Sequence, residues 1–300
     1  REYIFVLDVS GSMHGFPLNT AKALIKKLLG NLRSTDYFNV VLFAGTSVVM
    51  STASVPVNQA TLRRAMGVID RQRGGGGTEL LAALRRAYAV KPPASRGVSR
   101  TVVVITDGYV GVEAETFRFI RKGLGHANCF AFGIGSSVNR ALIEGMARAG
   151  LGEPFVVLSS AQAAATADRF RRYIQQPVLT DIRLTFSSSQ VYDVVPARPP
   201  DLLARRPLVI FGKYRGRGGG NVLVSGYTGG GVFKKTLPLG TTAGKSTKPL
   251  RVLWARKWAE NLMDQLAMLP GNRDLIRGVT RLGLRYNLLT RFTSFVAVDK

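Results

Sequence analysis

Strand-like and helix-like segments alternate through the first 176 residues, and this alternation constrains the fold more than any other feature of the sequence. Continuous apolar runs such as YIFVLD (3–8) and RTVVVITDG (100–108) are typical of strands buried on both faces. The alternation predicts an α/β fold with a doubly wound, mostly parallel sheet and helices on both faces. The expected strands are 3–8, 36–45, 46–51, 100–108, 127–135 and 154–159, and the expected helices are 17–32, 58–72, 78–90, 112–124, 138–150 and 160–176.

The hydrophobic period changes at Pro177. Short alternating segments separated by glycine turns predict an antiparallel β segment over residues 177–249, with strands at 180–186, 207–216, 220–228 and 231–239. A helical pair (250–269 and 273–286) and a last strand (292–298) are expected in residues 250–300. In the first of these helices, Trp254, Trp258, Leu262 and Leu266 recur every fourth residue, which is typical of a core-facing stripe. We therefore expect two domains, 1–176 and 177–300.

Three features bear on where such a chain operates. It contains no apolar run of about 18 residues, so we expect no membrane span in this fragment. It starts at Arg1 with neither an initiator methionine nor a signal peptide, and we interpret it as a piece of a longer protein. The single cysteine, Cys129, lies in the apolar run CFAFGIG, which predicts a buried thiol in a strand and excludes an internal disulfide.

The formal net charge is +24, and the excess is spread over both parts of the chain. Residues 1–176 hold 22 basic and 11 acidic groups, and residues 177–300 hold 20 and 7. This distribution rules out a basic tail as the source of the charge. It is compatible with a general bias toward arginine, and also with attraction to a polyanion such as nucleic acid, an acidic glycan or an anionic cell surface.

Polar oxygen-bearing side chains gather at predicted ends of strands and helices. Asp8, Ser10 and Ser12 alternate directly after the first strand, Thr78 follows a run of four glycines, and Asp107 ends another strand. The carboxyl ends of parallel strands form the crevice in which doubly wound sheets bind ligands. Each piece alone is also typical of an ordinary turn or helix cap. Their joint occurrence favours one site with two carboxylates and three hydroxyls.

This set of ligands predicts a hard divalent cation. Oxygen ligands without histidine or thiolate suit Mg²⁺, Ca²⁺ or Mn²⁺, and the small number of charged ligands favours octahedral Mg²⁺ with bound waters. Two carboxylates only balance the charge of the ion, so the site keeps affinity for one more anionic oxygen from outside. An Asp or Glu side chain of a protein partner is the expected source.

The motifs DVSGSM, GGGGT and ITDG resemble the metal-ion-dependent adhesion site of von Willebrand factor type A (vWA) domains. The family pattern of Asp-x-Ser-x-Ser, a distant Thr and a distant Asp fits Asp8, Ser10, Ser12, Thr78 and Asp107 without departure, and the resemblance covers about residues 1–176. It implies that the two serines, and Thr78 when ligand is bound, contact the ion directly. It also implies that the two aspartates act directly or through water.

The order of segments resembles a narrower family. The vWA-like part, the β segment, LWARKWAENLM and IRGVTRLGLRYNLLTRFTSFVAVD are similar to inter-alpha-trypsin inhibitor heavy chains and their bacterial relatives. This resemblance implies a β-domain before the vWA domain and an exported protein, secreted or at the cell surface.

We therefore expect a binding module that adheres to an acidic protein ligand in a cation-dependent manner. An enzyme is not expected, because His14 and His126 have no evident acid–base partner and Cys129 is predicted to be buried. Two alternatives remain. The chain could be an intracellular vWA scaffold subunit, or its basic surface could bind a polyanion, with an anionic glycan or cell surface favoured over nucleic acid.

Overall fold

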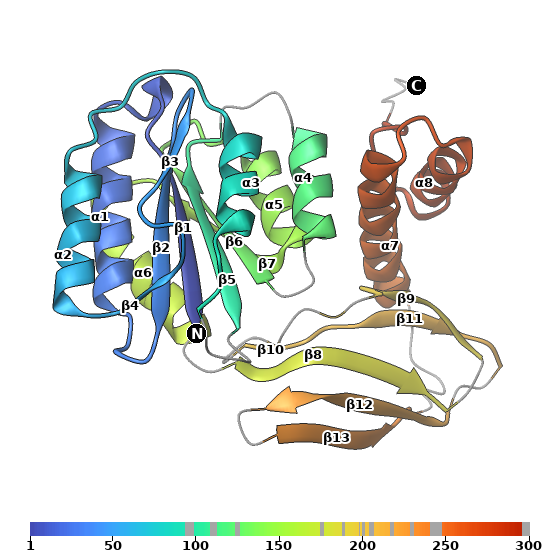
Figure 1. Cartoon of the computed structure of the whole chain (residues 1–300). Helices are drawn as coiled ribbons and strands as arrows, with labels where there is room; N and C mark the ends of the chain where they lie inside the picture. The colour runs from blue at the N-terminus through green and yellow to red at the C-terminus, as the bar shows by residue number, and fades with distance from the viewer. Residues whose placement is uncertain are drawn as a thin grey trace. The chain divides into compact units, whose positions relative to one another are not determined.

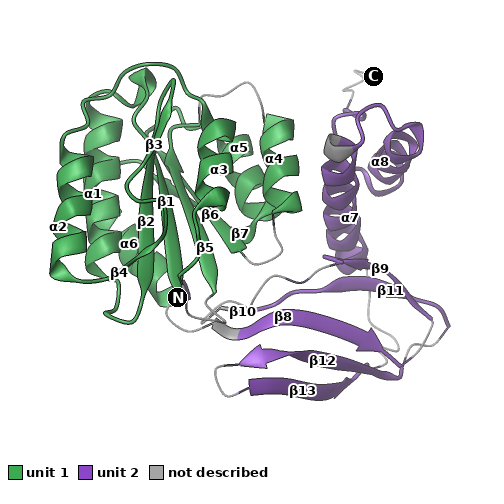
Figure 2. Ribbon diagram, in the orientation of Figure 1, with its two compact units in different colours: residues 1–172 green, residues 173–300 purple. Residues whose placement is uncertain are grey.

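The computed structural model of the chain, drawn in Figure 1, divides into two compact units, residues 1–172 and 173–300 (Figure 2). The division falls inside helix α6 (Ser160–Ile174), close to the change of hydrophobic period at Pro177. The structure describes the whole chain except residues 94–98, 109–112, 124–126, 175–176, 188–189, 198, 200–201, 204–206, 217–218, 229–230, 241–247 and 296–300.

A seven-stranded sheet forms the centre of the first unit, in the order β3-β2-β1-β5-β6-β7, with β4 also paired to β2. Strands β1, β2, β5, β6 and β7 are parallel, and the short β3 and β4 run antiparallel to β2. The strands are β1 (Glu2–Asp8), β2 (Tyr37–Phe43), β3 (Ser47–Val49), β4 (Val55–Pro56), β5 (Arg100–Thr106), β6 (Ala127–Ile134) and β7 (Leu151–Val157). The doubly wound, mostly parallel sheet expected from the sequence is confirmed.

Helices cover both faces of this sheet, with α1, α2 and α6 on one face and α3, α4 and α5 on the other (Figure 1). Residues of β1 alternate between the two layers: Ile4 and Val6 belong to the core cluster that includes α3 and α5, and both are fully buried. Burial on both faces is the physical reason for the continuous apolar runs. The remaining helices are α1 (Phe16–Gly30), α2 (Gln59–Asp70), α3 (Leu80–Ala89), α4 (Glu113–Lys122) and α5 (Arg140–Ala149).

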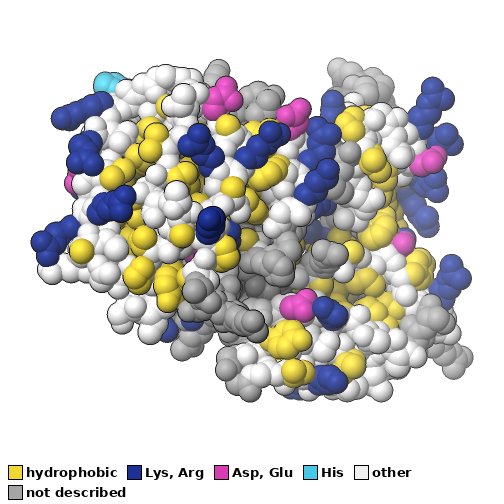
Figure 3. Space-filling view, in the orientation of Figure 1, with side chains coloured by type: hydrophobic (Ala, Val, Ile, Leu, Met, Phe, Trp, Pro, Cys, Tyr) yellow, Lys and Arg dark blue, Asp and Glu magenta, His cyan; other side chains and the backbone are white. Residues whose placement is uncertain are grey.

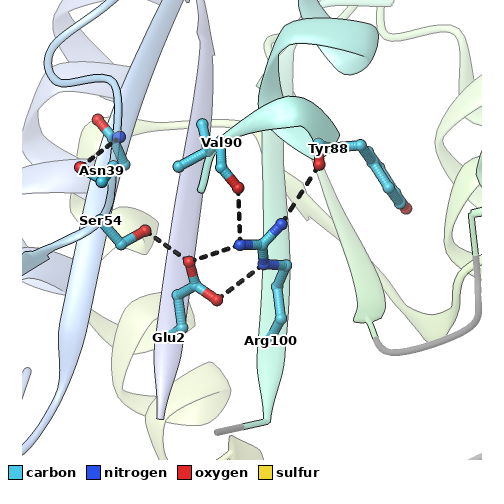
Figure 4. Close-up of polar contacts among 7 residues, drawn as sticks. Glu2, Asn39, Ser54, Tyr88, Val90 and Arg100 are labelled. Atoms are coloured by element: carbon cyan, nitrogen blue, oxygen red, sulfur yellow. Dashed lines mark hydrogen bonds and ion pairs between the residues drawn. The ribbon is translucent and has the colours of Figure 1, made fainter. Parts of the chain in front are cut away.

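A buried ion pair joins the amino ends of β1 and β5 (Figure 4). Arg100 donates from Nε to Glu2 Oε2 at 2.7 Å and from Nη2 to Glu2 Oε1 at 2.8 Å. The hydroxyl of Ser54 donates to the same Oε1 at 2.6 Å. Arg100 also donates to the backbone oxygen of Tyr88, in the last turn of α3, and to that of Val90, which follows the helix. Five hydrogen bonds therefore fix the end of the sheet opposite the strand tips that hold Asp8 and Asp107.

Cys129 is fully buried in β6, as expected, and burial raises the pKa of its thiol to about 12. At pH 8 about one native thiol in ten thousand is ionised, compared with about one in ten for a thiol at its ordinary pKa of 9.0. We expect a disulfide reagent at pH 8 to react with Cys129 at least about a thousand-fold more slowly in the native chain than in the urea-unfolded chain. Comparable rates, followed by absorbance of the released thiolate, would contradict this burial.

The second unit contains two antiparallel sheets and a helical pair. The larger sheet has the order β10-β8-β12-β13, and the smaller pairs β11 with β9. The bounds are β8 (Pro177–Phe186), β9 (Val191–Val195), β10 (Leu202–Leu203), β11 (Phe211–Tyr214), β12 (Asn221–Thr228), β13 (Gly231–Pro238), α7 (Lys248–Met268) and α8 (Arg273–Tyr286). Trp254 on α7 is 5% exposed and donates from Nε1 to the backbone oxygen of Asp193. This hydrogen bond connects α7 to β9.

Two expectations for the second unit need correction. The sequence analysis missed β9 and β10, and the predicted strand at 292–298 does not form over its described part. Residues 292–295 hold a turn with an isolated bridge between Thr290 and Thr293, and residues 296–298 lie outside the described residues. Thr293 donates its hydroxyl to the oxygen of Leu288, so a local turn at the end of α8 satisfies these polar groups without a strand partner. Within the described residues, no helix combines the length and apolarity needed to cross a bilayer.

Candidate metal centre

Asp8 ends the central strand β1 and is fully buried. β1 lies between β2 and β5, so the chain leaves it toward one side and returns on the other, which makes its carboxyl end the switch point of the sheet. Because β1 and β5 are in parallel register, Thr106 at the end of β5 lies beside Asp8. The hydroxyl of Thr106 donates to Asp8 Oδ2 at 2.6 Å. The sequence analysis missed Thr106, although a threonine immediately before Asp107 was the available signal.

The turn after β1 directs two hydroxyls to one place. The backbone N–H of Ser10 donates to Asp8 Oδ1 at 2.9 Å, a local side chain–backbone bond typical of an Asx-turn. The hydroxyl oxygens of Ser10 and Ser12 are 3.2 Å apart. Ser10 is fully buried, whereas Ser12, in the short 3₁₀ turn Gly11–Met13, is exposed. The structure therefore brings Asp8, Ser10 and Ser12 together at the switch point, with Ser12 on the solvent side.

The glycine run before Thr78 packs against the same turn. Gly75 donates its N–H to the oxygen of Val9, and the N–H of Gly11 donates to the oxygen of Gly76, both at 3.0 Å. Gly76 has φ +80°, and a Cβ there would lie 3.3 Å from the backbone nitrogen of Gly45, so both the backbone conformation and the close contact disfavour a side chain at this position. Thr78 follows this loop at half-buried exposure. Gly75 and Gly76 therefore contact the turn that holds the serines, and Thr78 follows Gly76 by two residues.

Asp107 directly follows β5, next to the strand that ends in Asp8, and is half-buried. Its backbone oxygen accepts from the N–H of Asn139 at 3.3 Å. The Asn139 side chain caps α5 by accepting from Leu142 N, and it donates to Glu113 Oε1 of α4 at 2.6 Å. Asn139, which the sequence analysis did not identify, therefore connects Asp107 to α5, and through Glu113 to α4.

The buried carboxylate of Asp8 would be stabilised by a nearby positive charge. Burial raises the pKa of Asp8, the hydrogen bonds from Ser10 and Thr106 offset part of that rise, and the negative charge of Asp107 raises the pKa further. Among the described residues, no Lys or Arg side chain forms an ion pair with Asp8. A buried carboxylate without a compensating charge is costly. A divalent ion beside Asp8 would supply that charge.

The donors fit a hard cation. Carboxylates and hydroxyls offer only oxygen, which suits Mg²⁺, Ca²⁺ or Mn²⁺. In the part of the chain that the structure describes, no group of three or more His, Cys, Asp or Glu side chains could hold a metal. Hydroxyl oxygens are also hard ligands, and serine or threonine stands at positions 10, 12 and 78.

A doubly wound, mostly parallel sheet with an Asp-x-Ser-x-Ser turn after its central strand places this chain in the class of Rossmann-like α/β domains. The family model of the von Willebrand factor type A domain matches residues 1–154, just over half of the chain. The chain belongs to this family. The narrower resemblance to inter-alpha-trypsin inhibitor heavy chains and bacterial relatives stays a prediction.

Relatives in other organisms match the whole chain. Human von Willebrand factor A domain-containing protein 5A is 28% identical over 323 aligned residues, which cover 100% of this chain and 40% of the relative. A Dictyostelium discoideum protein of the same description, DDB_G0286969, is 27% identical over 311 residues, covering 100% of this chain and 15% of the relative. The chain thus spans less than half the length of these relatives, and both of its units have counterparts in them.

Solved structures support the fold. The von Willebrand factor type A protein from Catenulispora acidiphila matches with a TM-score of 0.65 and 18% identity, over 96% of this chain and 80% of that one. Proximal thread matrix protein 1 from the mussel byssus, solved with a zinc-occupied adhesion motif, matches 56% of this chain and 44% of its own with a TM-score of 0.44 and 19% identity. At that score the second likeness indicates nothing about the metal of this chain.

Proposed function

We propose that this chain is a divalent-cation-dependent binding module whose last metal ligand is an acidic side chain of a protein partner. Mg²⁺ is the proposed ion, with Ca²⁺ or Mn²⁺ as substitutes, and Asp8, Ser10, Ser12, Thr78 and Asp107 are the proposed ligands. The observation that carries the proposal is the buried carboxylate of Asp8. It is oriented by two hydrogen bonds, and among the described residues no cationic side chain pairs with it.

Each residue of the proposed site would have a distinct role in binding the ion. Thr106 and the N–H of Ser10 hold the two oxygens of Asp8, so the carboxylate is oriented before any partner arrives. Ser12 is exposed and Asp107 half-buried, so these two positions would face solvent at the proposed site. A bound divalent ion would supply positive charge that attracts one external carboxylate. The contacts of Gly75 and Gly76 with the turn after β1 support the choice of Thr78, two residues further on, as a ligand.

Binding, rather than catalysis, is the activity that we infer. His14 is exposed, and its Nδ1 lies 3.1 Å from the backbone oxygen of Arg73, a contact that provides no acid–base partner. The thiol of Cys129 is fully buried with its pKa raised to about 12, which leaves no reactive thiolate at neutral pH. His126 lies outside the described residues.

We further propose that the module works outside the cell, as a secreted or surface protein. The basic surface would then speed encounter with acidic partners or anionic glycans. The support for this location is the resemblance of the segments after the vWA domain to exported heavy-chain relatives.

A salt series with and without chelator separates metal-site binding from simple charge attraction. The probe is fluorescently labelled poly-L-glutamate, titrated with the 300-residue chain in Mg²⁺ and again in EDTA. We expect EDTA to remove a binding component that survives moderate salt, because a close carboxylate–cation contact in a crevice is screened less than surface charge. If EDTA has no effect and salt removes all binding, the adhesion site is not the function, and attraction of polyanions by the arginine surface explains the result.

A further inference from the structure

An arginine stripe runs along the solvent face of α8, in the second unit. Arg273, Arg277, Arg281 and Arg285 recur at every fourth residue, and all four are exposed. At about 1.5 Å per residue the stripe is about 18 Å long, with a guanidinium about every 6 Å along the axis. Figure 3 shows Lys and Arg side chains along the outer edge of the helical pair.

The face that carries the stripe is fixed by packing. Most apolar residues of α8 turn toward the rest of the second unit: Val279 is fully buried, and a Cβ added at Gly278 would lie 3.0 Å from Leu262 of α7. Asn272 caps the start of the helix by accepting from two backbone N–H groups, and Asn287 ends it in the left-handed conformation. The four arginines therefore stand on a rigid, capped helix whose orientation within the pair is set by its apolar face.

The stripe does not serve the stability of α8. Like charges four residues apart destabilise a helix by about 0.2–0.5 kcal/mol per pair, and the stripe contains three such pairs. Arg273 stands at the first helical position, where the helix dipole disfavours a cation. The only acidic residue of α8 is Asp274, 91% exposed and 3.9 Å from Arg277. Within α8, the one pair of Arg277 with Asp274 therefore offsets only part of the repulsion along the stripe.

We propose that the arginine stripe of α8 binds the phosphate backbone of a nucleic acid without reading its sequence. Guanidinium groups bind phosphate oxygens through paired N–H donors, and a regular row of them suits a partner with regularly repeated phosphates. A membrane surface is a poorer fit. An amphipathic helix binds lipid through its apolar face, and the apolar face of α8 is already packed in the second unit, with Leu284 the one apolar residue exposed beside the stripe.

The test compares two double variants of the 300-residue chain that remove the same charge. Arg277→Gln/Arg281→Gln neutralises the centre of the stripe, and Arg85→Gln/Arg86→Gln neutralises two exposed arginines of α3 in the first unit. Glutamine keeps the helix propensity of arginine. All three like-charge pairs involve Arg277 or Arg281, so the stripe variant should melt no lower than the parent chain, and lost binding cannot then be assigned to unfolding.

The measurement is fluorescence anisotropy with a labelled 20-base-pair duplex of mixed sequence, over a series of NaCl concentrations. Two lost phosphate contacts should reduce the salt slope by about 2 and the affinity at 0.1 M salt by about 50-fold. The α3 variant should change affinity by a few-fold at most and leave the slope unchanged. EDTA should not affect this binding, which separates it from the metal centre.

Three outcomes would overturn the proposal. Equal losses in the two variants would mean that net charge, not the stripe, attracts the duplex. An unchanged salt slope in the stripe variant would mean that these arginines contact no phosphate. Binding to phosphatidylserine vesicles that depends on Arg277 and Arg281, without such dependence for the duplex, would assign the stripe to an anionic membrane instead.

Discussion

Replacing Asp8 with asparagine is expected to lower the affinity of the chain for Mn²⁺ or Mg²⁺ by about 100-fold or more. Loss of a residue that only supports a metal ligand already costs about 10–100-fold, and Asp8 brings a full negative charge to the site. Asparagine has the same shape, so its oxygen can still accept from Ser10 N and its amide can donate to the hydroxyl of Thr106. The variant should therefore fold while losing the ion.

Calorimetric titration with Mn²⁺ and thermal unfolding measure the two sides of this prediction. Metal at about 100 times the dissociation constant of the parent chain should stabilise the parent by about 2.7 kcal/mol and the Asp8→Asn variant by less than about 0.5 kcal/mol. Asp70→Asn on α2, which removes an exposed carboxylate with the same substitution, should behave as the parent. Ser12→Ala tests the site at an exposed position where the fold is not at risk. Wild-type affinity in both Asp8→Asn and Ser12→Ala would show that the metal binds elsewhere or not at all.

Replacing Glu2 with alanine is expected to lower the free energy of unfolding by about 3–5 kcal/mol. Glu2 is 1% exposed, and its partner Arg100 is 13% exposed, so the change leaves a guanidinium with little access to water and no counter-charge within the network of Figure 4. Ser54 loses the acceptor of its hydroxyl at the same time. The loss should appear in urea unfolding as a lower midpoint at constant slope.

A double variant shows whether the penalty comes from the unpaired charge. Glu2→Leu/Arg100→Met replaces the pair by apolar side chains of similar volume, and such replacements are often neutral or stabilising. We expect it to recover most of the stability that Glu2→Ala loses. Asp70→Ala, which breaks the solvent-exposed pair with Lys26, should lose less than about 1 kcal/mol. Equal effects of Glu2→Ala and Asp70→Ala would mean that water reaches Arg100 in the folded chain.

The local patterns of the sequence determined most of the elements. α8 spans Arg273–Tyr286, the same residues that the apolar period predicts. Its apolar stripe and its capping residue Asn272 both involve residues close together in the sequence, so a local pattern is enough to predict it. β9 escaped prediction for the opposite reason. Asp193 lies at the centre of β9 with φ +49°, and a charged residue there interrupts the alternation of apolar residues that marks a strand. β9 also pairs with β11, whose residues lie about 20 positions further along the chain.

The site divides in the same way. The Asp-x-Ser-x-Ser spacing is local, and hydrogen bonds within the tight turn after β1 bring Asp8, Ser10 and Ser12 together. Strand order is not local. Only the parallel pairing of β1 with β5 puts Thr106 within hydrogen-bond distance of Asp8, 98 residues earlier in the chain.

What the sequence by itself determined was therefore the class of fold, the bounds of most elements and the Asp-x-Ser-x-Ser turn of the proposed metal centre, because each depends on periods and spacings of a few residues. The tertiary structure decided which strand ends are neighbours, that Glu2 pairs with Arg100, and that Asn139 connects Asp107 to α5 and, through Glu113, to α4. These contacts join residues that are distant in sequence, and their geometry follows from how the sheet and its helices pack, which no local period encodes.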